Sequence, residues 1–449
     1  MSKKTLHSAN THSPRSHAAA LNWAKLAIAA TLASAPLAIA EEQPAKPVLT
    51  ELSLTVKEIY DSNVFGSEYN LAGFDEVANV ESWVTAVAPK ATVNLLSAFG
   101  IDGGSVSALD VGYAGVYSFY HSAPDESNQR HNFINSLKYK SGAWSASLDN
   151  TLTYVDGDTT TPHFSTSSAY GSASARERRE QFQDRGKFEV RYDDELWFAR
   201  AVGSLLYYDL RTQQHRAVAE YAGWQNYVDR SDANAGFDFG YKAAQTWALT
   251  TGYRYGSQFQ DKLPSDIRPD GKHSNSHYHR VLVGVEGKIL PWLKVDLQAG
   301  PDFRSYEDSA YIGINGASHT WFYSDASLTA TLGKNDTLTL SNKIWNFVSS
   351  TGVATYRDST YSLGYKHKFN SALSATAGIR VLGSAYDAPT VRNDWLYTYS
   401  LGLQYTVNKH VSLTADYART QADNRLDEAL TPGREFNQDL ITLGVRVAL

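Results

Sequence analysis

Residues 395–407 read WLYTYSLGLQYTV, and this stretch decides the fold class. Its odd-numbered positions, from Trp395 to Val407, are all aromatic or aliphatic, whereas its even-numbered positions are Leu, Thr, Ser, Gly, Gln and Thr. Successive side chains of a β-strand point to opposite faces of the sheet, so the segment has one apolar face and one largely polar face. It is longer than the average soluble strand of about 5–6 residues and fits a tilted membrane strand. The stretch therefore predicts a strand of a transmembrane β-barrel.

The same period of two recurs along most of the chain. It is clear in residues 281–286, 293–300, 361–369 and 373–381, and in residues 441–449 it continues to the last position. Counting such segments gives about eighteen strands, with sixteen as the alternative, and an even number is usual for a bacterial single-chain barrel. We therefore predict an all-β fold, a single transmembrane antiparallel β-barrel over residues 51–449.

The links between these segments alternate between short and long. Short links rich in Asn, Gly, Asp and Ser occur at residues 140–142, 333–336, 370–371 and 408–410, and this composition is typical of hairpin turns. Long polar links occur at residues 156–180, 211–225 and 260–276. The asymmetry predicts short periplasmic turns at one end of the barrel and long extracellular loops at the other.

The N-terminus has the pattern of a secretory signal peptide. Residues 1–25 carry four basic residues and no acidic one, residues 26–39 are apolar, and the run ends at Ala38-Ile39-Ala40. The apolar run is shorter than the roughly 20 residues that a spanning helix needs, although a retained membrane anchor is the alternative. We predict that residues 1–40 are cleaved and that residues 41–50 form a short periplasmic segment before the barrel.

Composition limits the function classes. The chain has no Cys, which excludes a disulfide framework and a lipoprotein anchor. Loss of the four basic residues of the signal peptide takes the net charge from -6 to -10, which argues against a nucleic-acid partner. Nucleotide-binding and zinc-protease motifs are absent, so the sequence predicts no cofactor, no metal and no catalytic residue.

Residues 60–65 of the first expected strand read YDSNVF. With the signal peptide, the length and the strand repeat, this segment resembles the second type of β-barrel porin, an outer-membrane family of porin-like barrels. The resemblance implies a barrel that is a monomer or a homotrimer, whose solute is usually unassigned. It implies no catalytic residues.

Charged side chains on the polar faces of the expected strands are the candidates for lining the lumen. They are Arg191, Arg254, Arg280, Glu286, Lys294, Asp296, Lys343, Lys366, Arg380, Asp416 and Arg446. The set has a basic lean, and charged rings along a pore set its selectivity. One hypothesis is therefore a weak preference for anions or acidic sugars. The alternative is that these residues form ion pairs that brace the wall across neighbouring strands.

Other conspicuous residues have structural interpretations. His273, His277 and His279 are expected in one solvated loop rather than at a metal, because no acidic cluster accompanies them. Asp156 and Asp158 are expected to form a turn rather than a calcium site, and residues 176–180 are expected to be the solvated start of a strand. Aromatic residues at strand ends fit interfacial girdles; examples are Trp83, Tyr207, Tyr255 and Trp321.

The sequence therefore predicts an outer-membrane, porin-like channel for passive diffusion of small hydrophilic solutes. Its expected partners are the outer-membrane lipid, those solutes and the barrel-assembly machinery, which the C-terminal strand ending at Leu449 would engage. Two alternatives stay open. One is a non-conducting barrel that acts in surface adhesion or polysaccharide export, and the other is a barrel hydrolase.

Overall fold

The computed structural model describes residues 47–64, 66, 80–101, 104–156, 180–211, 228–261, 273–307, 318–349, 355–386, 393–425 and 435–449. The chain divides into two units, Met1–Pro44 and Ala45–Leu449, and all the described residues belong to the second. The expected signal peptide, Phe65, residues 157–179 and Asp158 within them lie outside the described residues.

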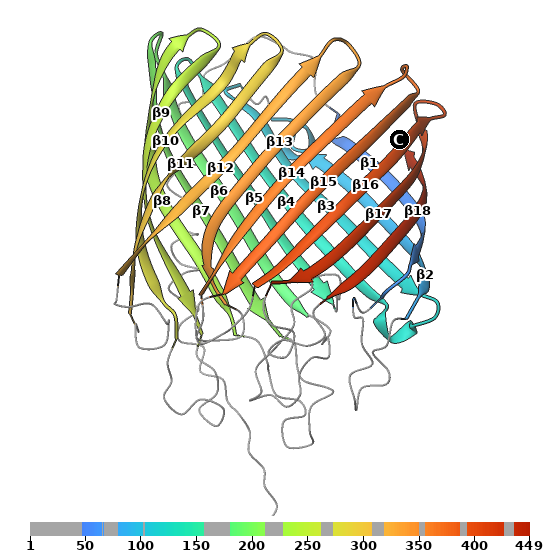
Figure 1. The fold of residues 1–449 in the computed structure, drawn as a ribbon. Coiled ribbons are helices and arrows are strands. Elements are labelled where there is room, and N and C mark those ends of the chain that lie inside the picture. Colours follow the sequence, from blue (N-terminus) through green and yellow to red (C-terminus); the bar gives the residue numbers. More distant parts are fainter. Residues whose placement is uncertain are drawn as a thin grey trace, which may run out of the picture. The chain divides into compact units, whose positions relative to one another are not determined.

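Eighteen antiparallel strands form one closed sheet in the described part of the chain (Figure 1). Each strand pairs with the next along the chain, and β1 also pairs with β18, which closes the barrel. The strands are β1 (Leu49–Asp61), β2 (Ser82–Asn94), β3 (Val106–Tyr120), β4 (Asn128–Ser141), β5 (Trp144–Asp156), β6 (Gln181–Asp193), β7 (Trp197–Leu210), β8 (Arg230–Ala244), β9 (Trp247–Gln260), β10 (Ser276–Leu290), β11 (Leu293–Tyr306), β12 (Ser318–Leu332), β13 (Asp336–Val348), β14 (Thr355–Lys368), β15 (Leu373–Tyr386), β16 (Asn393–Thr406), β17 (Val411–Asn424) and β18 (Phe436–Ala448). This confirms the predicted all-β barrel and its eighteen strands.

The only helices in these residues are the single turns α2 (Leu95–Ala98) and η2 (Pro124–Glu126). Neither has the length and apolar character that a membrane-crossing helix requires.

The period of two in the sequence corresponds to two distinct faces of the wall. On β16, Tyr399, Leu401 and Leu403 point outward and remain 44%, 60% and 51% exposed, although they are apolar. The apolar residues at alternate positions of β18 also face outward. The residues between them face inward, and the register places them beside inward-facing residues of the neighbouring strand. Exposed large apolar side chains over a whole wall are unfavourable in water and favourable against lipid. The wall is therefore built to sit in a membrane.

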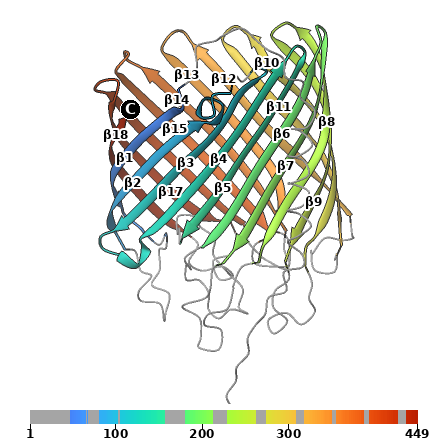
Figure 2. The ribbon, with the colours of Figure 1, turned by 180° about the vertical axis from the view of Figure 1, so that it is seen from behind.

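The four short links join strands as expected. Gly142 and Gly333 adopt φ of 55° and 73° in the turns between β4 and β5 and between β12 and β13, a backbone conformation that favours glycine. We call this end of the barrel the turn end; it lies at the top of Figures 1 and 2. The opposite end, where the long connections leave the strands, is the loop end. In outer-membrane barrels the short turns face the periplasm.

The YDSNVF segment closes the barrel at the loop end. The Asn63 amide donates to the carbonyl of Asn437 at 3.0 Å, and the Gln438 amide donates to Asp61 at 2.9 Å. The backbone N–H of Asp439 donates to the Ser62 hydroxyl at 2.7 Å. These contacts tie the end of β1 to the start of β18, so the segment acts as a clasp between the first and last strands.

The expectation for Trp321 is wrong. Trp321 lies opposite Asp302 in the β11–β12 register, on the inner face, and its indole N–H donates to the Tyr306 hydroxyl at 3.3 Å. Trp83 and Tyr255 do face outward, at 48% and 47% exposure, as a girdle requires. An aromatic residue at a strand end belongs to a girdle only if its side chain faces outward. The odd-numbered residues of β11 face outward, whereas on β12 the even-numbered residues do.

Candidate functional site: the barrel lumen

All eleven charged residues proposed for the lumen lie on the inner face of the wall. The strand register places each of them on the face opposite to the exposed apolar side chains. They fall into four groups, and the groups differ in their contacts. The groups are Arg191, Glu286, Lys294 and Asp296; Arg254 and Arg280; Lys343, Lys366 and Arg380; and Asp416 and Arg446.

Arg254 and Arg280 are held in a packed, ion-paired core. Arg254 binds both carboxylate oxygens of Asp238, at 2.6 and 3.0 Å, and Arg280 lies 2.7 Å from Asp302. The side chain of Asp238 is 0% exposed and also accepts from Arg200 at 2.7 Å. A buried carboxylate that binds two guanidinium groups braces neighbouring strands, because removal of one partner would leave a charge without compensation. Arg254 and Arg280 therefore make the kind of contact expected if the charged residues brace the wall across neighbouring strands.

The core continues to the loop end through one hydrogen-bonded network. Gln258 donates to Asp232 at 2.6 Å and accepts from Arg304 at 2.6 Å, and Tyr278 donates to Asp232 at 3.0 Å. Gln258, Tyr278 and Arg304 are at most 1% exposed. The inward side chains of β8–β11 therefore fill the space in front of them and leave no open lumen there.

Strands that are not neighbours in the sheet touch each other across the lumen at the loop end. Gln258 of β9 donates to the carbonyl of Asn346 on β13 at 2.9 Å, although three strands separate β9 from β13 in the sheet. Arg230 of β8 donates to the carbonyl of Val348 at 2.8 Å and to the Tyr356 hydroxyl at 2.9 Å. Gln260 reaches the carbonyl of Ser349 at 2.6 Å.

This cross-lumen contact also has an apolar part. Phe347, Val348 and Tyr356 form a buried cluster, and Leu206 and Tyr208 of β7 pack against it. The Arg230 guanidinium lies 4.6 Å from the Phe347 ring centre and 4.9 Å from that of Tyr208. At this level the lumen is divided into a closed lobe, bounded by β6–β13, and the space bounded by β14–β18 and β1–β5. We call the latter the open lobe.

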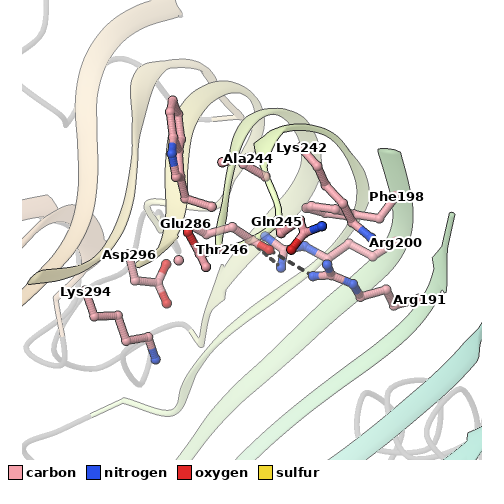
Figure 3. Close-up of a pocket in the computed structure, with 13 residues that line it drawn as sticks. Arg191, Phe198, Arg200, Lys242, Ala244, Gln245, Thr246, Glu286, Lys294 and Asp296 are labelled. Atoms are coloured by element: carbon pink, nitrogen blue, oxygen red, sulfur yellow. Dashed lines mark hydrogen bonds and ion pairs between the residues drawn. The ribbon is translucent and has the colours of Figure 1, made fainter. Parts of the chain in front are cut away.

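The turn end of the closed lobe contains a pocket of about 310 Å³ (Figure 3). Arg191 and Arg200 point toward Glu286 from one side, at 2.8 and 2.9 Å, while Lys294 and Asp296 approach from the other. The Arg191 guanidinium also covers the Phe198 ring at 3.6 Å. Four of the eleven proposed residues therefore meet in one pocket, on the turn-end side of the packed core.

The remaining charged residues line the open lobe or its border. Lys366, Arg380 and Asp416 are exposed, and in the described part of the chain none of them has an ion-pair partner. Arg446 lies 3.0 Å from Glu51, which Lys90 also contacts at 2.7 Å. Lys343, on β13, pairs with Asp325 at 3.4 Å while both side chains stay about half exposed.

The inner face of β14–β18 and β1–β5 has a small basic excess. Its basic residues are Lys57, Lys90, Arg130, Lys138, Lys140, Lys366, Lys368, Arg380 and Arg446, and its acidic residues are Glu51, Asp61, Asp110, Asp149, Asp358, Asp394 and Asp416. Nine basic residues therefore face seven acidic ones among the described positions of these strands. Exposed charges that are not neutralised by a close partner contribute to the potential along a water-filled path.

The expectation that three histidines share a solvated loop is wrong for two of them. His277 and His279 lie on the outer face of β10, and His279 contacts the Tyr253 hydroxyl at 2.7 Å. His277 contacts the Ser257 hydroxyl at 2.8 Å, lies 3.4 Å from Glu307 and packs near the rings of Tyr255 and Phe259. No group of three or more potential metal ligands occurs in the described residues.

The sequence missed Arg230, Asp232, Asp238, Gln258, Asp302 and Arg304, which build the packed core and the cross-lumen contact. The alternation along each strand shows that these residues face inward. It does not show their partners, because a contact between strands that are far apart in the sheet leaves no pattern in the local sequence. The run of inward acids and arginines on β8–β11 was the only available indication.

An outward apolar face, an inward polar face and a closed sheet of eighteen strands define an outer-membrane β-barrel. A family model described as "Putative beta-barrel porin 2" matches residues 227–449, from just before β8 to the C-terminus, and confirms the resemblance to that family. The chain is thus an outer-membrane β-barrel, and residues 227–449 are similar to that family of porins.

Solved structures of outer-membrane proteins are similar to this chain at low identity. The outer membrane protein opdK from Pseudomonas aeruginosa is 10% identical with a TM-score of 0.41, covering 89% of this chain and 99% of that chain. OccK2 (OpdF) from the same organism is 11% identical with a TM-score of 0.43, covering 89% and 98%. The siderophore receptor PirA from P. aeruginosa is 9% identical with a TM-score of 0.38, covering 89% and 80%. A search of curated proteins gave no match.

Proposed function

We propose that the protein is a channel for passive diffusion of small hydrophilic solutes with a weak preference for anions, and that the solute path runs through the open lobe. The proposal rests mainly on the cross-lumen contact, which fills the closed lobe and leaves the inner face of β14–β18 and β1–β5 to border a path. Exposed Lys366 and Arg380 lie on that face without ion-pair partners among the described residues. Acidic sugars and other small anions are the solutes that such a lining favours.

The two hypotheses about the lumen, bracing ion pairs and a lining that favours anions, apply to different charged residues. Arg254 and Arg280 are ion-paired and buried, so they contribute to bracing and little to the potential of an open path. Lys366 and Arg380 can interact with a passing solute. The basic excess of two is small, so the preference for anions is expected to be weak rather than strict.

Reversing two charges should invert the selectivity. With Lys366→Glu and Arg380→Glu together, the inner face of β14–β18 and β1–β5 changes from an excess of two basic residues to an excess of two acidic residues. We expect the reversal potential in a salt gradient to change sign from anion-selective to cation-selective. The measurement is planar-bilayer recording of the refolded mature protein at low ionic strength, where screening is weakest.

The matched control for this test is Arg357→Glu. Arg357 lies on the same strand, β14, but its side chain faces outward. This substitution changes the charge by two units, as each of the two inward substitutions does, and it should leave the sign of the reversal potential unchanged. An unchanged sign in the double variant would remove the proposed path through the open lobe.

A further inference from the structure

The outer face of β4–β6 carries a ladder of polar side chains where a lipid-facing wall is expected to be apolar. Asn135 donates to Asn150 at 3.4 Å, and Asn150 donates in turn to the carboxylate of Asp184. The three residues lie on neighbouring strands, and the register places their side chains on the outer face. They form one hydrogen-bonded ladder across three strands.

The ladder lies between two aromatic levels of the same strands. Toward the loop end, Tyr154 packs against Phe182 at 4.9 Å, and toward the turn end Trp144 packs against Tyr192 at 5.1 Å. Aromatic side chains mark the two membrane interfaces of a barrel. The ladder therefore lies at the depth of the apolar band, with Asn150 at the middle of β5 and Asp184 nearer the loop end.

Polar groups at this depth need partners. Each Asn amide has two N–H donors, and a carboxylate can accept several hydrogen bonds. The hydrogen bonds within the ladder therefore use only some of its donors and acceptors. Among the described residues, no lysine or arginine lies within ion-pair distance of Asp184. By contrast Asp439, an outward acid on β18, lies 3.6 Å from Arg419 and accepts from Tyr417 at 2.7 Å. Lipid chains can satisfy none of the remaining groups of the ladder.

The two sides of the barrel differ in their outward residues. On β14–β18, in front in Figure 1, the outward side chains between the interfaces are bulky, with Leu401 60% and Leu443 59% exposed. On β6, in front in Figure 2, Gly186 occupies the same face beside Asn150, and Leu205 of β7 lies next to it. Small side chains allow the backbone of another protein to approach closely within a membrane.

We propose that this face, the outer surface of β4–β7 around Asn135, Asn150 and Asp184, is an interface with a second copy of the same chain. A partner at this depth must itself span the membrane. A second copy brings amide donors and a carboxylate acceptor to the same depth, so the groups left over on one ladder complement those on the other. Hydrogen bonds of this kind stabilise association in membranes modestly, and Gly186 beside them allows a close approach.

Site-directed crosslinking tests the interface directly, because the chain has no native cysteine. Asn135→Cys is compared with Leu401→Cys, which lies near the middle of β16 on the opposite side of the barrel. In outer membranes treated with a short bismaleimide, we expect a crosslinked dimer band for Asn135→Cys and little or none for Leu401→Cys. A monofunctional maleimide measures whether each thiol is reachable.

The mass of the wild-type protein in mild detergent completes the test. We expect an oligomer, and we expect the combined change Asn150→Leu and Asp184→Leu to raise its dissociation constant by about tenfold or more. A monomeric wild type would overturn the proposal. So would equal crosslinking at both positions, or an oligomer whose stability the double substitution leaves unchanged. Because these readouts are independent of conductance, a non-conducting but oligomeric barrel would reject the proposed channel and keep the interface.

Discussion

Replacement of Asp302 by alanine is expected to lower the free energy of unfolding by about 3–5 kcal/mol. The Asp302 side chain is 2% exposed and binds two buried guanidinium groups, those of Arg280 at 2.7 Å and Arg304 at 3.2 Å. Without the carboxylate, two positive charges face each other in a space that is closed to bulk water. Urea unfolding of the refolded barrel in lipid vesicles measures the change.

The control for this experiment is Asp416→Ala. Asp416 is also an inward acid, but it is exposed and has no ion-pair partner among the described residues. Its loss is expected to change the free energy of unfolding by no more than about 0.5 kcal/mol. Equal losses in the two variants would mean that the packed core between β8 and β11 does not brace the wall.

The second large effect is expected at the cross-lumen contact. Arg230→Ala removes the donor to the Val348 carbonyl and the Tyr356 hydroxyl, together with the cation that packs on Phe347 and Tyr208. The freed polar groups would bind water, and the open lobe would widen beside the contact, while the packed core of β8–β11 and the contacts of Gln258 and Gln260 stay in place. We therefore expect the single-channel conductance to rise, by less than about twofold.

Arg185→Ala is the matched control for the conductance measurement. Arg185 is an inward arginine on β6 that donates to the Tyr208 hydroxyl at 3.1 Å, and among the described residues it makes no contact across the lumen. Its removal should change the conductance much less than removal of Arg230. If the Arg230 variant keeps the wild-type conductance while folding normally, the contact does not limit the cross-section.

Local alternation was enough to predict the fold. In residues 395–407 the apolar positions identify the outer face of β16, and the Asn- and Gly-rich links identify the short turns. These features depend on neighbouring residues only. The same parity argument placed all eleven charged candidates on the inner face.

The internal arrangement of the lumen could not be predicted in this way. Whether Arg280 is free or paired depends on Asp302 of the neighbouring strand, and the register that joins them is set by the whole sheet. The contact of Gln258 with Asn346 joins strands that are not neighbours. Its existence depends on how the barrel wall bends, and period-two alternation carries no information about that bending. His277 was misplaced because the start of β10 could not be located within a long polar link, and Trp321 was misplaced because it was not known which positions of β12 face outward.

The most direct test of the account is the conductance of the wild-type mature protein in a planar bilayer, with the reversal potential measured in a salt gradient. The account predicts stable single-channel steps and a weakly anion-selective reversal potential. A correctly folded barrel that gives no steps, or one that is neutral or cation-selective, would contradict the proposed path through the open lobe.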